Sequence, residues 1–364
     1  MTPFRIDIPQ VDLDDLHDRL ARTRWTEQLP GEGRQRGVPV ADLRELAGYW
    51  RTGFDWRAQE ARLNEFPQFV EEIDGYDVHF LHVRSKRPDA LPLILTHGWP
   101  NSFVEFAALI EPLARDFHVV VPSVPGFGFS AAPREAGWTA ARVAGMWAEL
   151  MRRLGYDRYG TQGGDLGAYV APEIAKAAPG HVAGVYVISG LGFPTEADVP
   201  DMTDEERAAF AELQSQDWMT GVDHHALLKA APQTFAYGWH DSPIAALAWF
   251  THKFQEFSVS PRPLFEVLDR DLFLTNLSVY WFTRTFGSSS WPMYDSTGFA
   301  WPTGQKDAPT GVFSGPPGIR RLAERTNTIT HWPDHHKAEH HFVAMEAPEV
   351  LAADLKAFFT PEAS

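Results

Sequence analysis

The segment Gly163-Gly164-Asp165-Leu166-Gly167 limits the fold more than any other part of the chain, because it joins a strand pattern to a helix pattern through an abrupt turn. The residues before it, Arg158 to Gln162, have strand character, and Ala168 to Ala178 follow a helical pattern. Such a turn holds its central side chain above a parallel sheet, and it requires small residues two positions to either side because the chains crowd there. We therefore expect Asp165 at the apex of a sharp strand-to-helix turn.

Two interpretations of this aspartate are open. A carboxylate at a helix N-terminus is stabilised in its charged form, by about 0.3–1 kcal/mol at exposed sites, so Asp165 would be ionised and ready to attack a carbon electrophile. The alternative is that Asp165 only caps the helix after a glycine-rich loop, which is common. The segment by itself does not decide between a nucleophile and a cap, because short motifs often mislead.

Length and composition limit the class of protein and its partners. The 364 residues are enough for one large α/β domain with an inserted or appended subdomain, and the net charge of −16 argues against nucleic acid or an anionic membrane as partner. The absence of cysteine excludes a disulfide, a thiolate nucleophile and a cysteine-ligated metal. No apolar run approaches the ~20 residues of a membrane span, and the first residues do not resemble a signal peptide. We therefore expect a soluble, cytoplasmic protein.

Strand and helix patterns alternate along the rest of the chain. Two extended runs, Gln68 to Ile73 and Tyr76 to Val83, flank Asp74-Gly75, which is a hairpin signal. Further strands of the buried type are expected at Leu91 to Leu95, His118 to Val121, Val182 to Ile188, Thr310 to Phe313 and Asn327 to Thr330. Alternation of this kind predicts a mostly parallel sheet with crossover helices, and ligands bind such sheets at the carboxyl ends of the strands.

The region from about Thr195 to Phe286 has helical periodicity and no clear strand, so we interpret it as a helical cap inserted between two sheet strands. The chain begins with a helical arm and closes with a helix from Glu349 to Phe359, preceded by Pro348 at a favoured first-turn position. We expect four parts: an N-terminal arm with the first strands (1–88), a first part of the core (89–194), the helical cap (195–298) and a second part of the core (299–364).

Matches to one enzyme family extend along nearly the whole chain. They include Thr23-Arg24-Trp25, Phe54-Asp55-Trp56-Arg57, His97-Gly98-Trp99-Pro100, Ser102-Phe103-Val104-Glu105-Phe106, the turn from Pro125 to Ser130, and Gln162 to Gly167. In these stretches the chain resembles the microsomal-type epoxide hydrolases, whose fold is that of the α/β-hydrolase superfamily. So many ordered matches are more specific than any one motif, and they favour Asp165 as a nucleophile over Asp165 as a cap.

The resemblance implies a two-step hydrolysis of a small-molecule epoxide, without cofactor or metal. Asp165 would attack an epoxide carbon to form a hydroxyalkyl ester, and water activated by His341 would then hydrolyse the ester and release a vicinal diol. The chain has 15 histidines, so it is the place of His341, after the last strand and before Phe342, that matches the family. The sequence leaves open whether the chain forms a homodimer.

The resemblance also assigns the groups that assist these two steps. The backbone N–H groups of Trp99 and Leu166 would form the oxyanion hole, since Pro100 has no N–H, and a cis peptide bond before Pro100 is implied as well. Tyr294 would donate a hydrogen bond to the epoxide oxygen, because a phenol is neutral at pH 7 and can stabilise a developing alkoxide. For His97 and Tyr280 we expect structural roles, with the His97 ring anchoring its turn.

Several positions depart from the family pattern. The second donor position holds His224, whose imidazole can donate only if it is protonated or in the right tautomer, and Tyr237 is a less suitable substitute. The acid that should orient His341 falls at Gly318, the alternative location at 189–192 is also neutral, and neither Asp334 nor Glu339 can be placed behind the base from sequence. His340 stands where a small residue is usual, and Leu166 where the family often has tryptophan.

Because of these departures we keep two alternatives to epoxide hydrolysis. The first is a non-hydrolytic opening or rearrangement of a natural product on the same scaffold. The second is a ligand-binding homologue that has lost catalysis, although the joint presence of Asp165, His341 and Tyr294 argues against it.

Overall fold

The protein is represented by a computed structural model that describes residues 1–31, 33–188, 191, 194, 196–215, 224–291, 304–313, 319–333 and 340–360. The expected donor Tyr294 and the position expected for the orienting acid, Gly318, lie outside these residues, as do Asp334 and Glu339. The helices and strands below are those of the described ranges.

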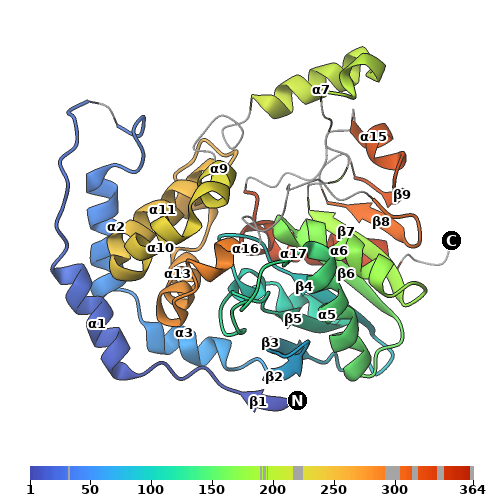
Figure 1. Cartoon of the computed structure of the whole chain (residues 1–364), viewed down its shortest axis with the longest axis horizontal. Coiled ribbons are helices and arrows are strands. Elements are labelled where there is room, and N and C mark those ends of the chain that lie inside the picture. The colour runs from blue at the N-terminus through green and yellow to red at the C-terminus, as the bar shows by residue number, and fades with distance from the viewer. Residues whose placement is uncertain are drawn as a thin grey trace.

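A nine-stranded sheet, in the order β1-β2-β3-β5-β4-β6-β7-β8-β9, forms the core of the described chain (Figure 1). Its strands are β1 Thr2–Phe4, β2 Gln68–Ile73, β3 Tyr76–Val83, β4 Leu91–Thr96, β5 Phe117–Pro122, β6 Tyr159–Gly164, β7 Val182–Ile188, β8 Pro309–Val312 and β9 Thr328–His331. The first three strands and the β3–β5 pair are antiparallel, and every pair from β5 through β4 to β9 is parallel. The expected hairpin and the expected parallel core are both confirmed.

The strand order brings the loop after β4 and the turn after β6 together at one edge of the sheet. Because β4 lies between β5 and β6, the loop after β4 leaves the sheet next to the turn after β6, with Thr96 paired to Gly163. Strand β5, which lies next to the central strand β4, is buried along its whole length, as its continuous apolar run predicts. The His97-Gly98-Trp99-Pro100 loop therefore lies beside Asp165 although the two are far apart in sequence.

Helices cover this sheet and continue beyond it. They are α1 Gln10–Ala21, α2 Val40–Thr52, α3 Trp56–Leu63, α4 Ile110–Ala114, α5 Ala140–Arg153, α6 Leu166–Ala177, α7 Asp204–Gln214, α9 His224–Ala230, α10 Pro232–Asp241, α11 Pro243–Glu256, α12 Leu264–Val267, α13 Arg270–Thr283, α15 Arg320–Glu324, α16 Val343–Glu346 and α17 Pro348–Phe359, with short 3₁₀ turns at Phe103–Phe106, Val199–Asp201 and Ser288–Ser290. Across the described ranges, none of the helices is both long and apolar enough to cross a membrane.

The last helix, α17, packs directly on the middle of the sheet. A Cβ atom at Gly184 or Gly311 would come within about 3 Å of the Phe358 ring, and one at Gly160 would lie 2.4 Å from the Phe359 ring. These three strand positions lack a side chain, so the two phenylalanines of α17 can reach the backbone of the sheet.

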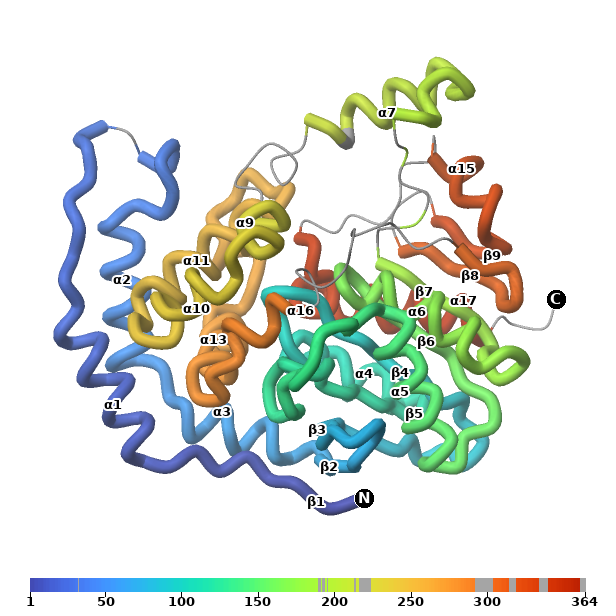
Figure 2. The backbone as a smooth tube through the Cα atoms, viewed as in Figure 1, coloured from blue at the N-terminus to red at the C-terminus, as the bar shows by residue number. Residues whose placement is uncertain are grey.

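Helices α9 to α13, which lie between β7 and β8 in sequence and which we call the cap helices, form a layer beside the sheet, and the N-terminal arm lies along the outer side of this layer (Figures 1 and 2). Helix α7 stands apart from them (Figure 1), where Glu206 accepts from Arg321 of α15. Helices α1 and α2 both contact α11 of the cap. The buried Trp50 of α2 donates from Nε1 to Ser278 Oγ of α13 at 3.0 Å, and Tyr49 donates to Asp271 at 2.7 Å. The arm therefore supports the cap, and its helical character is confirmed.

We expect Ser278→Ala to lower the free energy of unfolding by about 1–3 kcal/mol, because the buried indole N–H of Trp50 loses its acceptor. Urea unfolding followed by tryptophan fluorescence measures the change. The control is Thr52→Ala, which removes a hydroxyl that donates to Gly48 O on the exposed side of α2 and should change stability by no more than about 0.5 kcal/mol. Equal losses of unfolding free energy in the two variants would show that the bond between Trp50 and Ser278 does not stabilise the contact between arm and cap.

Candidate active site

The turn between β6 and α6 has the geometry that its glycines predict. Asp165 adopts φ 52° and ψ −123°, a region that residues with a side chain rarely occupy. A Cβ at Gly163 would lie 2.1 Å from the Gly167 carbonyl oxygen, and one at Gly167 would lie 2.0 Å from the Thr96 carbonyl oxygen. Only glycine fits at these two positions, so the requirement for small residues on both sides of Asp165 is confirmed.

The carboxylate of Asp165 is held by the two backbone donors expected from sequence. Its Oδ1 atom accepts from the N–H of Trp99 at 2.9 Å and from the N–H of Leu166 at 2.7 Å. Burial alone would raise the pKa of Asp165, but the hydrogen bonds from His341 and from these two N–H groups outweigh burial and lower it to about 2. The side chain keeps 21% of its surface exposed, so an ionised carboxylate remains accessible at neutral pH.

The loop after β4 carries the first of these donors close to Asp165. The Trp99–Pro100 peptide bond is cis, as the resemblance implies, and a Cβ at Gly98 would lie 2.4 Å from the Asp165 Cβ. The buried His97 ring accepts from Val124 N at 3.1 Å through Nε2, so its Nδ1 carries the hydrogen and donates to Gly98 O at 3.2 Å. The structural role expected for His97 is confirmed.

Helix α13 of the cap is hydrogen-bonded to the loop that carries Trp99. Asn276 donates from Nδ2 to Pro100 O at 2.9 Å, and its Oδ1 accepts from the Ser102 hydroxyl at 2.7 Å. One turn further along α13, the buried Tyr280 donates to Asn101 O at 2.6 Å. Tyr280 is therefore a packed helix residue, as expected, and the cap fixes the backbone that presents the Trp99 N–H.

His341 faces the other oxygen of the same carboxylate. Its Nε2 lies 3.4 Å from Asp165 Oδ2, and its backbone N–H donates to Phe257 O at 2.9 Å. The structure thus brings the expected base and the expected nucleophile together, on the side of Asp165 away from the two N–H donors. In the part of the chain that is described, no carboxylate bonds to Nδ1 of His341, and the positions from which we expected the supporting acid lie outside that part.

His224, the possible ring-opening donor, lies beside this pair at the start of α9. Its ring stacks on the Trp99 ring at 5.2 Å and 11° and meets the Phe257 ring edge-on at 5.8 Å. Burial lowers the pKa of His224 to about 2, helped by the nearby His225 and Lys253. The imidazole is therefore neutral at working pH, so it offers one N–H as a hydrogen-bond donor.

Aromatic rings surround the Asp165–His341 pair. Besides its contact with His224, Trp99 lies 6.3 Å from Trp249 of α11, and Phe257 lies 5.3 Å from the His341 ring. Phe342 meets the His341 ring edge-on at 5.0 Å. The ionised carboxylate of Asp165 therefore lies in a largely apolar, aromatic setting.

Sequence reasoning missed one residue of the site, Glu105. Its buried carboxyl group accepts from Gly98 N at 3.1 Å through Oε2, one residue before Trp99, whose N–H binds Asp165. Burial, together with the charge of Asp165, raises the pKa of Glu105 to about 8. The signal that could have found it is the position of Glu105 in a matched stretch directly after the Trp99-Pro100 turn, where an acid among apolar residues needs a partner.

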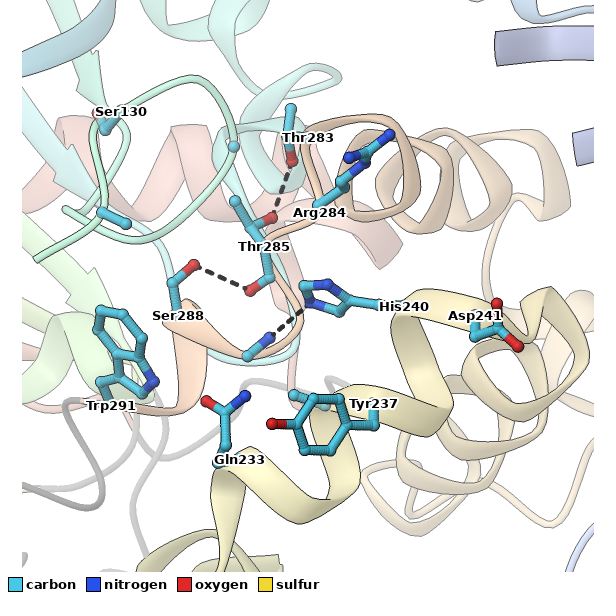
Figure 3. Close-up of a pocket in the computed structure, with 14 residues that line it drawn as sticks. Ser130, Gln233, Tyr237, His240, Asp241, Thr283, Arg284, Thr285, Ser288 and Trp291 are labelled. Atoms are coloured by element: carbon cyan, nitrogen blue, oxygen red, sulfur yellow. Dashed lines mark hydrogen bonds between the residues drawn. The ribbon is translucent and has the colours of Figure 1, made fainter. Parts of the chain in front are cut away.

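A cavity of about 620 Å³ lies between α10 and the chain after α13, and its lining includes neither Asp165 nor His341 (Figure 3). His240 reaches into it and accepts from Gly287 N at 3.2 Å, and the exposed Tyr237 lies at its rim beside Gln233 (Figure 3). Tyr237 therefore lies at a cavity that Asp165 does not line, and it is not placed to act as the second ring-opening donor.

The fold and the site together define a class. A mostly parallel sheet, a helical layer inserted between two of its strands and an aspartate on the strand-to-helix turn are the features of an α/β-hydrolase. Residues 1–106 match the family described as epoxide hydrolase N terminus, and residues 92–232 match the family described as alpha/beta hydrolase fold.

Individual relatives narrow the class. A candidate epoxide hydrolase of Stigmatella aurantiaca (strain DW4/3-1) is 40% identical, over 99% of this chain and 84% of its own. Epoxide hydrolase 1 of Oryctolagus cuniculus is 30% identical, over 98% of this chain and 88% of that protein. The solved Aspergillus niger epoxide hydrolase superposes with a TM-score of 0.83 at 30% identity, over 98% of this chain and 95% of that one. The chain therefore belongs to the epoxide hydrolase family.

We expect Glu105→Gln to flatten the pH dependence of stability. The pKa of Glu105 rises from an ordinary 4.5 to about 8 on folding, so the folded state binds more protons than the unfolded state between these values. This contribution to stability is fully present below pH 4.5 and is lost as the pH rises through about 8. Glutamine cannot ionise, so the variant lacks that loss. Urea unfolding at several pH values from about 5 to 8.5 measures how the free energy of unfolding changes with pH. The control is Glu45→Gln on the exposed side of α2, in which the free energy of unfolding should depend on pH as in the wild type.

Proposed function

We propose that this chain opens epoxides to vicinal diols through a covalent ester on Asp165. One observation carries the proposal: the two oxygens of Asp165 have different partners. Oδ1 is held by two backbone N–H groups, whereas Oδ2 faces His341 Nε2 at 3.4 Å. One oxygen can thus become the carbonyl oxygen of an ester while the other forms the new bond to carbon.

In the first step Oδ2 of Asp165 attacks an epoxide carbon, and the carbon–oxygen bond of the ring breaks. The ring oxygen becomes an alkoxide that needs hydrogen-bond donors and then a proton. The neutral His224, stacked on Trp99, supplies an N–H to it, and Tyr294 is our expectation for the phenolic donor. Since the pKa of Asp165 is about 2, the nucleophile is already ionised at neutral pH.

In the second step water is delivered to the ester carbon. His341 Nε2 takes a proton from water, the water oxygen bonds to Cγ of Asp165, and the negative charge moves to Oδ1. The N–H groups of Trp99 and Leu166 already point at that oxygen, at 2.9 and 2.7 Å. Collapse restores the carbonyl at Oδ1 and breaks the bond between Cγ and Oδ2, and the proton held by His341 passes to the leaving Oδ2, so the diol leaves with the old aspartate oxygen. The water oxygen stays on Asp165 as part of a carboxyl group, whose remaining proton goes to solvent and balances the proton that the ring oxygen takes up.

The substrate class and the division of the chain belong to the same proposal. The aromatic rings of Trp99, Trp249, Phe257 and Phe342 favour a small epoxide with apolar substituents. The placement of α7 to α13 between β7 and β8 supports the expected division into arm (1–88), core (89–194 and 299–364) and cap (195–298).

We expect Asp165→Ala to abolish turnover and His341→Gln to accumulate an adduct of protein plus one substrate, because the ester forms but is not hydrolysed. Intact-protein mass spectrometry after mixing with styrene oxide or cyclohexene oxide detects the adduct. The matched control is the double variant, which lacks the nucleophile and should gain no mass. Wild-type hydrolysis by His341→Gln without an adduct would show that the mechanism is wrong.

The same enzyme in ¹⁸O-labelled water separates hydrolysis from rearrangement. In the first turnover the label should enter Asp165, and over many turnovers it should enter the diol. A cyclised or isomerised product without label would instead identify a non-hydrolytic opening on the same scaffold.

We expect His224→Phe to slow ester formation by about 10²-fold, the lower end of what a positioned donor contributes. His224→Gln, which keeps an N–H donor, should retain more of the rate. Because the pKa of His224 is about 2, the wild-type rate of ester formation should show no titration of this group between pH 5 and 8. Single-turnover adduct formation measures both effects, and His225→Phe controls for local disturbance. An unchanged rate in His224→Phe would remove His224 from the ring-opening step.

A further inference from the structure

His340, the neighbour of the base, makes contacts that nothing in the chemistry above requires. It is almost completely buried, it follows the last strand directly before His341, and it stands where a small residue is usual in the family that the chain resembles. A buried imidazole loses its hydration, so its two ring nitrogens need partners inside the protein. The identity of those partners shows what the ring does.

Both ring nitrogens of His340 bind backbone groups, on two different segments. Nδ1 accepts from Phe342 N at 3.0 Å, so the hydrogen of the neutral ring is on Nε2, which donates to Phe254 O at 2.9 Å. Phe254 lies in the last turn of cap helix α11, where carbonyl groups lack intrahelical partners. Burial lowers the pKa of His340 to about 3, so the ring stays neutral and keeps this tautomer at working pH.

The backbone around His340 makes further bonds to the same helix end. Ser258, just after α11, pairs with His340 as an isolated antiparallel bridge, and Phe257 O accepts from His341 N at 2.9 Å. On the other side, Glu346 of α16 accepts from His340 N at 2.9 Å. The segment that carries His341 is therefore bound to the cap by one side chain and by its own main chain.

Aromatic packing fixes the His340 ring in this position. The ring lies 5.6 Å from the Phe254 ring and 5.7 Å from the Phe342 ring, and these two phenylalanines lie 5.2 Å from each other. Phe254 also meets Phe273 of α13 edge-on at 4.9 Å. The ring cannot turn away from Phe254 O without disturbing a cluster that joins two cap helices.

We propose that His340 is a positioning residue that ties the His341 segment to the end of cap helix α11 and thereby sets the distance between His341 Nε2 and Asp165. Its ring nitrogens are both bonded to backbone groups and are not directed at Asp165, so His340 acts through the backbone of its neighbour. The inference rests on the proposed function, because it assigns His340 to the step in which His341 delivers water to the ester.

The test separates the two chemical steps in His340→Ala. Ester formation depends on Asp165 and the ring-opening donors, whereas ester hydrolysis depends on the placement of His341. We expect hydrolysis to slow about 10- to 100-fold, as for a catalytic group displaced by up to about 1 Å, and ester formation to change less than about threefold. Rapid mixing with styrene oxide, followed by mass spectrometry of the quenched protein, gives both rate constants, and the ester should accumulate in the variant.

Two further variants test the two hydrogen bonds of the His340 ring separately. His340→Gln can still donate to Phe254 O, and His340→Asn can still accept from Phe342 N, so each should hydrolyse the ester faster than His340→Ala. The control is His82→Ala, which removes another buried histidine, on β3, whose Nε2 lies 2.8 Å from the Tyr156 hydroxyl. It should lose stability without changing the ratio of the two rate constants.

The outcomes distinguish this inference from the function on which it rests. If wild-type protein forms diol through an ester and His340→Ala keeps the wild-type ratio of rate constants, the positioning role is wrong and the function stands. If both steps slow in proportion to a loss of folded protein, in His340→Ala and in His82→Ala alike, His340 is only a packing residue. If wild-type protein forms neither ester nor diol, the function and the inference fail together.

Discussion

Two hydrogen bonds to a single carboxylate oxygen organise this protein. Trp99 lies in the loop after β4, Leu166 begins helix α6 directly after the turn that follows the neighbouring strand β6, and both direct their N–H groups at Oδ1 of Asp165. This arrangement requires a strained backbone at Asp165 and glycines where a Cβ would strike neighbouring atoms. Because the donors are backbone groups on rigid elements, they are already in place for the charge that the mechanism we propose develops on that oxygen.

The cap helices are hydrogen-bonded to both segments that lie beside Asp165, the loop that carries Trp99 and the segment that carries His341. Helix α13 fixes the loop of the first donor through Asn276 and Tyr280, and the end of α11 fixes the segment of the base through Phe254 and Phe257. Asp165 and His341 thus belong to the core in sequence, but the backbone around them is hydrogen-bonded to helices inserted between β7 and β8. In the mechanism that we propose, a change within the cap can therefore alter the chemistry without touching a reacting atom.

The sequence predicted those features that follow from local rules. The turn at Asp165, the hairpin at Asp74-Gly75 and the structural role of His97 each follow from residue types with narrow conformational or bonding requirements. Glu105 was not identified from the sequence because its partner, the N–H of Gly98, approaches only when the loop folds back after β4. His340 was visible only as an unusual replacement, since its meaning depends on a carbonyl that lies 86 positions away. Long-range pairing of polar groups carries no periodic signal along a chain.

The N-terminal arm has a consequence for how the whole chain behaves. Its first strand is part of the sheet, while its helices lie against the cap, so one continuous segment bridges the two layers between which the chemistry occurs. The layer of cap helices is thereby contacted on its outer side by a segment that begins in the sheet. A truncation that removes β1 therefore takes an edge strand from the sheet and also cuts into the segment whose helices contact α11.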